Sequence, residues 1–129
     1  MISGSCLCGA VRFEVPLAPV QLTACNCEAC RKLGPLWAYY RPDEVTITGE
    51  TMGYQRHDIA DQDGPMLAFH HCPNCGCVTH WADLSPAETR MAVNARLMAA
   101  EIVEVAHIRR FDGTVSFTFL DDARQDGGT

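Results

Sequence analysis

Apolar and polar residues alternate through much of the first half of the chain. Val11, Phe13 and Val15 alternate with charged residues, and a second alternating run from Val20 to Ala24 follows a turn framed by prolines. Successive side chains of a strand point to opposite faces, so this period of two predicts strands with one buried face. Alternation, or aromatic and β-branched content, predicts further short strands at residues 36–41, 45–48, 51–56, 66–71, 77–81 and 115–120.

Two segments have helix signals. Cys27 to Leu33 is a short helix candidate, and Gly34-Pro35 is a typical helix stop. Ser85-Pro86-Ala87-Glu88 is a capping box with proline at the first helical position, and helix-tolerant residues follow to about Ala100. Residues 58–65 are acidic and rich in breakers, which predicts an exposed loop. The pattern predicts a mainly β fold of small antiparallel sheets with one or two short helical turns.

Length and charge narrow the class of protein. A chain of 129 residues is one domain by its length, and we expect residues 3–120 to form it and 121–129 to be a flexible polar tail. The formal charge of −6 argues against non-specific binding to the phosphate backbone of nucleic acids, so we expect no nucleic-acid partner. No apolar run is long enough to span a bilayer, so we expect no membrane partner.

Cysteine is the most informative residue type. A small chain with eight cysteines can be a secreted disulfide framework, but Met1-Ile2-Ser3-Gly4 shows neither a basic leader nor an apolar run. We therefore expect a cytoplasmic protein. Reducing conditions there favour metal binding over disulfides.

Two of the cysteine pairs share a local pattern. Cys6 and Cys8 are followed at once by Gly9, and Cys72 and Cys75 by a glycine as well. Residues i and i+2 of a strand face one side, and the second pair has the gap of a zinc knuckle, so all four sulfurs can surround one ion at about 3.8 Å separations. Four protein thiolates close a site, which makes it structural. Alternatively, Cys77 replaces one of the four.

The run Cys25-Asn26-Cys27-Glu28-Ala29-Cys30 lacks that pattern. Cys27 and Cys30 are spaced for one face of a first helical turn, whose positive end, with Arg31 and Lys32 beside it, favours thiolates. Three protein ligands and one exchangeable position are typical of a catalytic zinc. Zinc with three thiolates keeps a net negative charge, so it polarises carbonyls poorly but can deprotonate a thiol. Thiol chemistry is favoured over hydrolysis.

Other interpretations of this run stay open. A fourth ligand could close the site, the candidates being Cys77, His70, His71 and His80. His70 or His71 could instead hydrogen-bond a ligating sulfur, and the cluster could also be a metal-free redox centre. Arg31 and Lys32 could clamp ligand carboxylates or form an exposed helix face. The segment Trp37, Tyr39, Tyr40 and Arg41 could line a pocket for a peptide-like thiol, although aromatic residues at strand spacing are commonly core.

At these cysteines the chain resembles the glutathione-dependent formaldehyde-activating enzyme family, whose β-tent fold also appears in centromere protein V. The resemblance covers about residues 3–120. It rests on Gly4-Ser5-Cys6-Leu7-Cys8-Gly9-Ala10-Val11, Cys25-Asn26-Cys27-Glu28-Ala29-Cys30-Arg31 and Cys72-Pro73-Asn74-Cys75-Gly76. Cys77 is an additional thiol outside the family pattern, either capping the second site or inert in the core.

The resemblance implies two zinc ions. Structural zinc would be bound by Cys6, Cys8, Cys72 and Cys75, and catalytic zinc by Cys25, Cys27 and Cys30. It implies a carbon–sulfur lyase or synthase that adds glutathione to formaldehyde, giving S-hydroxymethylglutathione. It also implies a late strand at residues 91–97, a turn at 111–113 before a closing strand, and just a short turn at Ser85–Glu88.

The leading hypothesis is therefore a zinc enzyme that activates a small thiol towards a small aldehyde. A non-catalytic, zinc-stabilised protein-binding module of the same fold is the first alternative. A thiol-redox or metal-handling protein is the second.

Overall fold

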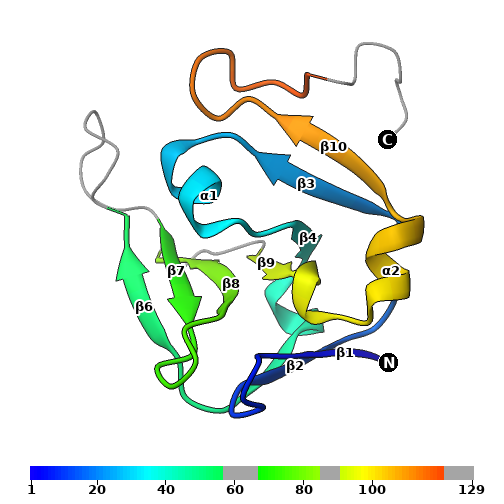
Figure 1. The fold of residues 1–129 in the computed structure, drawn as a ribbon, viewed down its shortest axis with the longest axis vertical. Coiled ribbons are helices and arrows are strands. Elements are labelled where there is room, and N and C mark those ends of the chain that lie inside the picture. Colours follow the sequence, from blue (N-terminus) through cyan, green and yellow to red (C-terminus); the bar gives the residue numbers. More distant parts are fainter. Residues whose placement is uncertain (57–66, 85–90, 121–129) are drawn as a thin grey trace.

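Two β-sheets make up most of the structure, a computed structural model that describes residues 1–56, 67–84 and 91–120 (Figure 1). The smaller sheet has the strand order β1-β2-β5, from β1 (Ile2–Ser5), β2 (Arg12–Val15) and β5 (Thr46–Thr48). The larger sheet has seven strands, in the order β10 (His107–Phe111), β3 (Gln21–Cys25), β4 (Trp37–Tyr40), β9 (Met91–Asn94), β8 (Val78–Asp83), β7 (Leu67–His71) and β6 (Met52–Gln55).

Helical segments are short. They are α1 (Glu28–Leu33), α2 (Ala100–Val105) and two 3₁₀ turns, η1 (Pro42–Glu44) and η2 (Ala95–Leu97). The prediction of a mainly β fold with small sheets and few helical turns is confirmed. None of the helices within the described residues is long and apolar enough to cross a membrane.

The core lies between the two sheets. Phe13 and Val15 of β2 are almost fully buried, which is the buried face that the alternation predicts. They pack with Leu22 of β3, Ala38 of β4 and Val93 of β9, from the middle of the larger sheet. Burial of these side chains stabilises the fold by about 1.5–3 kcal/mol for each large residue. The central strands are therefore a rigid platform for the segments at their ends.

The larger sheet is mixed, which the predicted antiparallel arrangement did not include. β10 runs parallel to β3 over five paired positions, from His107 opposite Gln21 to Phe111 opposite Cys25. The remaining strand pairs in both sheets are antiparallel. The chain reaches β10 through η2 and α2, which carry it back to the beginning of β3.

The predicted strand at residues 115–120 is wrong. Phe119 makes a single bridge to Phe111, and Phe117 has a φ of +54° that a continuous strand does not adopt. Asp112 accepts the backbone N–H groups of Thr114, Val115 and Ser116, so this segment forms a turn. The C-terminal edge strand of the described residues is β10 instead.

The short predicted helix is confirmed. α1 begins after Cys27, whose sulfur accepts the N–H of Cys30, and ends at Gly34 with a φ of +76°. The late strand is confirmed as β9 at Met91–Asn94, but residues 95–97 form η2. The predicted turn at Ser85–Glu88, the acidic loop at 58–65 and the tail at 121–129 lie outside the described residues.

The fold brings each cysteine group together at strand ends. The turn after β1 meets the turn between β7 and β8, which places Cys6 and Cys8 beside Cys72 and Cys75. Cys25 ends β3, and the chain turns directly into α1, which carries Cys30. The three-cysteine group therefore adjoins β3, and the four-cysteine group adjoins β7. In the strand order of the larger sheet, β4, β9 and β8 lie between these two strands.

Candidate metal centres and active site

The four-cysteine cluster consists of Cys6, Cys8, Cys72 and Cys75. Their sulfur atoms all lie within 4.8 Å of one another. Cys8 Sγ is 3.7 Å from Cys6 Sγ and 3.7 Å from Cys72 Sγ. Tetrahedral zinc with Zn–S bonds near 2.3 Å places its sulfurs about 3.8 Å apart. The spacing of these sulfurs therefore fits a zinc ion.

Backbone N–H groups point at these sulfurs. Val11 donates to Cys6 Sγ at 3.2 Å, and Asn74 and Cys75 donate to Cys72 Sγ at 3.4 and 3.5 Å. Such donors stabilise thiolates and orient them. The backbone N–H groups of Cys77 and Cys8 likewise lower the pKa of Cys75 to about 5.

The two halves of the cluster close in the same way. The N–H of Cys6 donates to the carbonyl of Val11 at 2.9 Å, and the N–H of Cys72 to the carbonyl of Cys77 at 2.9 Å. Gly9 and Gly76 adopt left-handed backbone with φ of +84° and +85°. Cys6 and Cys8 thus share a turn after β1 and do not lie in a strand, which corrects the geometry expected for this pair.

Cys77 lies beside the four-cysteine cluster. Its sulfur accepts the N–H of Leu7 at 3.4 Å, which links the two halves of the cluster. The prediction that Cys77 could cap the other cysteine group is therefore wrong. The four sulfurs of the cluster come together without it.

The three-cysteine cluster consists of Cys25, Cys27 and Cys30, with sulfurs within 4.8 Å of one another. Cys27 and Cys30 are 7% and 6% exposed, and Cys25 is half-buried. The N–H of Cys27 donates to Cys25 Sγ and the N–H of Cys30 to Cys27 Sγ, both at 3.4 Å. The first turn of α1 therefore directs its N–H groups at the cluster, as the spacing predicts.

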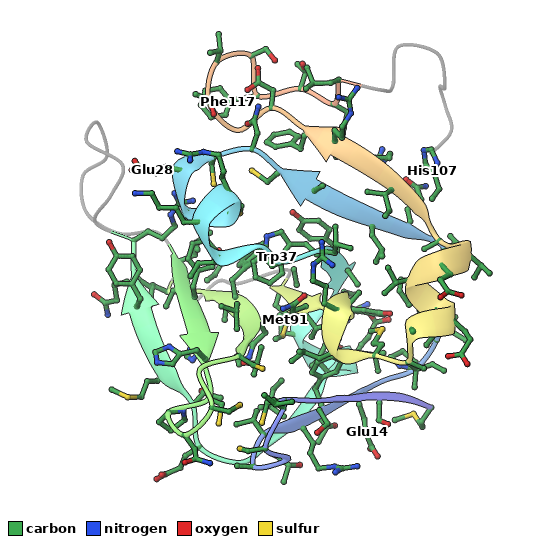
Figure 2. The ribbon with its side chains drawn as sticks, in the orientation of Figure 1. Glu14, Glu28, Trp37, Met91, His107 and Phe117 are labelled. Carbon is green, nitrogen blue, oxygen red and sulfur yellow. The ribbon has the colours of Figure 1, made fainter. Side chains whose placement is uncertain are left out.

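Trp37 supplies a further donor. Its indole Nε1–H donates to Cys30 Sγ at 3.4 Å, and its ring stacks on Phe69 with centroids 5.8 Å apart. Trp37 is buried in the interior of the molecule (Figure 2). It belongs to the core and lines neither the groove nor the hollow described below.

The three thiols share one negative charge in this arrangement. Contacts from the thiols of Cys25 and Cys30 lower the pKa of Cys27 to about 2, with smaller help from the Arg56 guanidinium. The contact with Cys27 raises the pKa of Cys25, and the contacts with Cys25 and Cys27 raise the pKa of Cys30. One thiolate is thus stabilised at the expense of two others, and a divalent cation is what allows three to form together. The donor set fits zinc.

A cation that the sequence did not single out acts on the three-cysteine cluster. Lys32 forms an exposed ion pair with Glu28 at 2.9 Å, and Arg31 is exposed on α1. Arg56 acts on Cys27 instead, and its guanidinium lies 5.1 Å from the centroid of Phe69. Arg56 follows β6 in the sequence, so no local motif joins it to the cysteines.

An open groove of about 510 Å³ lies between α1 and the edge of the larger sheet. It is lined by Glu28, Ala29, Lys32, Leu33, Tyr54, Phe69, His70, His71, Gly76 and Val78. Phe69 joins the groove to the three-cysteine cluster, because the same side chain packs in the buried group that contains Cys27 and Cys30. The groove is the candidate binding surface next to the cluster.

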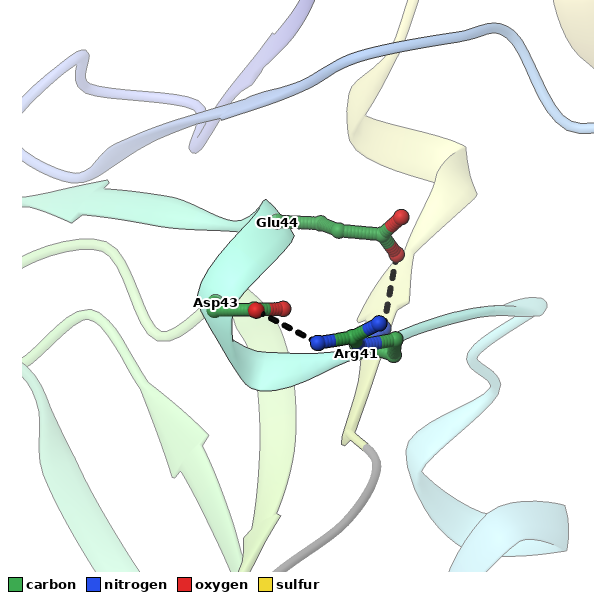
Figure 3. A network of polar contacts seen from close by, with 3 residues as sticks. All are labelled: Arg41, Asp43 and Glu44. Atoms are coloured by element: carbon green, nitrogen blue, oxygen red, sulfur yellow. Dashed lines mark hydrogen bonds and ion pairs between the residues drawn. The ribbon is translucent and has the colours of Figure 1, made fainter.

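The other aromatic candidates lie elsewhere. Tyr39 and Tyr40 line a separate hollow of about 370 Å³, and the Tyr40 hydroxyl donates to the carbonyl of Leu17. Arg41 is held at the η1 turn, where its side chain pairs with Asp43 at 2.7 Å and its backbone N–H donates to Glu44 (Figure 3). Tyr39, Tyr40 and Arg41 are therefore not part of the groove lining.

Among the described residues, no histidine joins either cysteine cluster. His70 and His80 stack with centroids 4.4 Å apart, and their Nδ1 atoms are hydrogen-bonded to Thr51 and Thr79. His71 lies on the groove wall. The alternative that Cys77, His70, His71 or His80 closes the three-cysteine cluster is not supported by this geometry.

The profile of the glutathione-dependent formaldehyde-activating enzyme family matches residues 1–110. The chain belongs to this family. The resemblance at the cysteine motifs is thereby confirmed over most of the chain. No curated protein sequence matches this family member significantly.

A solved structure shares the fold of this family member. The crystal structure of a Rhodobacter sphaeroides protein, a structural-genomics target, superposes with a TM-score of 0.64 at 24% sequence identity. The match covers 83% of this chain and 99% of that chain. At this identity the likeness concerns the fold alone.

Proposed function

We propose that this protein is a zinc-dependent carbon–sulfur lyase or synthase that adds a small thiol, glutathione, to formaldehyde or a related aldehyde. Membership of the family supports a formaldehyde-activating type of function. The observation that carries the finer proposal is the unequal size of the two clusters. One gathers four sulfurs, and the other gathers three, with no further ligand atom among the described residues.

The proposal assigns each cluster a zinc ion. Cys6, Cys8, Cys72 and Cys75 would hold a structural ion, because four thiolates close its coordination shell. Cys25, Cys27 and Cys30 would hold a catalytic ion, which supplies an open coordination position that favours the deprotonated form of an incoming thiol.

The proposed reaction needs no other reactant. The thiol sulfur forms a bond to the aldehyde carbon, the carbonyl π pair moves to oxygen, and that oxygen takes up the equivalent of the proton that the thiol releases. The product is the S-hydroxymethyl adduct, and the reverse reaction is the lyase direction. No oxidant or reductant is consumed.

The chain's own residues prepare the cluster for this reaction. Trp37 Nε1–H and the N–H groups of Cys27 and Cys30 each donate to a cysteine sulfur, which lowers the basicity of the protein thiolates. Arg56 places a positive charge near Cys27, where a negatively charged thiol substrate would approach. The groove beyond Phe69 is large enough for the body of a peptide-like thiol.

Exchange spectroscopy by NMR tests the proposal. In a mixture of formaldehyde and glutathione, catalytic amounts of the zinc-loaded protein should raise the exchange rate between free thiol and hydroxymethyl adduct above the spontaneous rate. The matched control is Cys27→Ser, which removes a ligand of the three-cysteine cluster and should return the rate to the spontaneous value. An unchanged rate with the folded, zinc-loaded protein would favour the alternative, a zinc-stabilised binding module.

A further inference from the structure

Gly113 lies directly against the three-cysteine cluster. A Cβ atom built on Gly113 would stand 2.7 Å from Cys25 Sγ and 3.2 Å from Cys27 Cβ. Cβ atoms essentially never come within 3.0 Å of another heavy atom, so a side chain at this position would displace the loop or the sulfur. The backbone of Gly113 therefore covers the Cys25 side of the cluster at contact distance.

Backbone conformation does not explain a glycine here. The described glycines with positive φ are Gly9, Gly34, Gly49 and Gly76, and Gly113 is not among them. Other residues can adopt the remaining conformations without the left-handed strain that favours glycine. The absence of a side chain at residue 113 is required by its contact with Cys25.

Hydrogen bonds to Asn26 fix the loop on both sides of Gly113. Asn26, which lies between two cysteines of the cluster, accepts the Gly113 N–H at 2.8 Å and the Thr114 hydroxyl at 3.1 Å through its Oδ1. Its own N–H donates to the carbonyl of Phe111 at 3.1 Å. Asn26 thus joins the cysteine run to the loop from residue 111 to 114.

The carboxylate of Asp112 stabilises the loop by accepting hydrogen bonds from the residues that follow it. Its carboxylate accepts the N–H groups of Ser116, Thr114 and Val115 and the Ser116 hydroxyl, at 2.9 to 3.1 Å. These donors keep the pKa of Asp112 well below its usual range. The carboxylate is therefore charged at neutral pH, and the turn keeps its shape.

From these contacts we propose that Gly113 is a positioning residue of the three-cysteine cluster. Residues 111–116 form a fixed cover that shields the Cys25 side from water and competing chelators, and thereby slows loss of the ion from this cluster. The inference rests on the proposed function, because it requires an ion at Cys25, Cys27 and Cys30. It adds a residue that neither motif spacing nor ligand chemistry identifies.

Zinc extraction by the chromogenic chelator 4-(2-pyridylazo)resorcinol measures this shielding. Cys27→Ser protein gives the release curve of the four-cysteine cluster alone, and the difference from wild type gives that of the three-cysteine cluster. We expect Gly113→Ala to speed release from the three-cysteine cluster at least tenfold and to leave the four-cysteine cluster unchanged. Asn26→Ala removes the side-chain hydrogen bonds to Gly113 and Thr114 without a clash, and it should speed release in the same cluster.

Val115→Ala is the matched control. Val115 is 78% exposed on the same loop and contacts Asp112 through its backbone N–H, which the substitution keeps. Its release curve should equal that of wild type. If both Gly113→Ala and Asn26→Ala release zinc at the wild-type rate, the proposal that residues 111–116 cover the cluster is overturned. If the wild-type protein holds no second zinc, the proposed function is overturned instead. Melting curves of the zinc-loaded variants distinguish site-specific release from general loss of the fold.

Discussion

The indole nitrogen of Trp37 donates a hydrogen bond to the sulfur of Cys30 across 3.4 Å, in a site where both residues are buried. Trp37 is in β4 and Cys30 in α1, so this bond links the larger sheet to the helix that presents the cysteines. A neutral N–H donor stabilises a thiolate without adding a competing charge. The same side chain thus serves the core and the cluster.

Trp37→Phe separates these two roles. The phenyl ring can keep the stacking on Phe69, but the donor to Cys30 is lost. A hydrogen bond to a charged group contributes about 1.5–3 kcal/mol, so zinc affinity of the three-cysteine cluster should fall about tenfold or more. Competition with a chelator of known affinity measures this. Phe69→Leu should instead reduce the free energy of unfolding and leave zinc affinity near the wild-type value; equal losses of affinity would contradict the assignment.

Cys27→Ser should mainly reduce reactivity, whereas Cys75→Ser should mainly reduce the stability of the fold. Cys75 belongs to the four-cysteine cluster, which joins the turn after β1 to the turn between β7 and β8. Losing a ligand there should destabilise the folded chain by several kcal/mol, since binding of a structural zinc is part of the folding free energy. Cys27→Ser should lose reactivity and keep a cooperative melting transition. Thermal unfolding followed by circular dichroism compares them, and similar losses of stability would refute this division of roles.

Asn94 of β9 is a buried polar residue that connects β8, the segment before β4 and the η2 turn. Its Oδ1 accepts the N–H groups of Leu36 and Arg96, and its Nδ2–H donates to the carbonyl of Val78 at 2.8 Å. Asn94→Ala leaves these backbone groups unpaired, which should reduce the free energy of unfolding by about 2–4 kcal/mol. Urea denaturation measures the change. Gln55→Ala, an exposed substitution in β6, should change stability by less than about 0.5 kcal/mol.

Stability should fall in mild acid because of His80. Burial, with a smaller contribution from the charge of neighbouring His70, lowers the pKa of His80 to about 4, against 6.5 for a free histidine. The unfolded chain therefore takes up a proton below pH 6.5 that the folded chain resists until about pH 4. Protonation of His80 leaves the free energy of unfolding unchanged above pH 6.5. As the pH falls from 6.5 to about 4, this protonation lowers the free energy of unfolding by about 3 kcal/mol in total.

His80→Gln tests this titration. Glutamine can still hydrogen-bond Thr79 but takes up no proton, so the decline in unfolding free energy between pH 6.5 and 4 should be smaller than in wild type. Protonation of cysteine thiolates affects both proteins alike and cancels in the comparison. Parallel curves of stability against pH would contradict the buried, neutral state of His80.

Alternation was sufficient to predict the strands whose one face is buried, such as β2, but it failed for β10. No residue of β10 is fully buried, so its sequence carries no periodic signal, and its strand conformation depends on parallel pairing with β3. α2 was missed for a different reason. Ile102, Val103 and Val105 favour strands by local propensity, and Ala99 gives no side-chain cap.

Cysteine spacing predicted which sulfurs come together, and the structure gathers the same two groups. That these cysteines bind zinc stays a prediction. Spacing could not reveal Arg56, Trp37 or Gly113, because each reaches the three-cysteine cluster from a different part of the chain. The family resemblance implied a turn at residues 111–113, but the contact of Gly113 with Cys25 is a tertiary feature.

Native mass spectrometry tests the central claim most directly, by counting ions on the intact chain with and without glutathione. The account predicts two zinc ions per wild-type chain, one ion for Cys27→Ser, and a glutathione adduct that requires the second ion. A wild-type chain with two ions that forms no adduct, or a metal-free chain whose mass reports disulfide bonds, would contradict it.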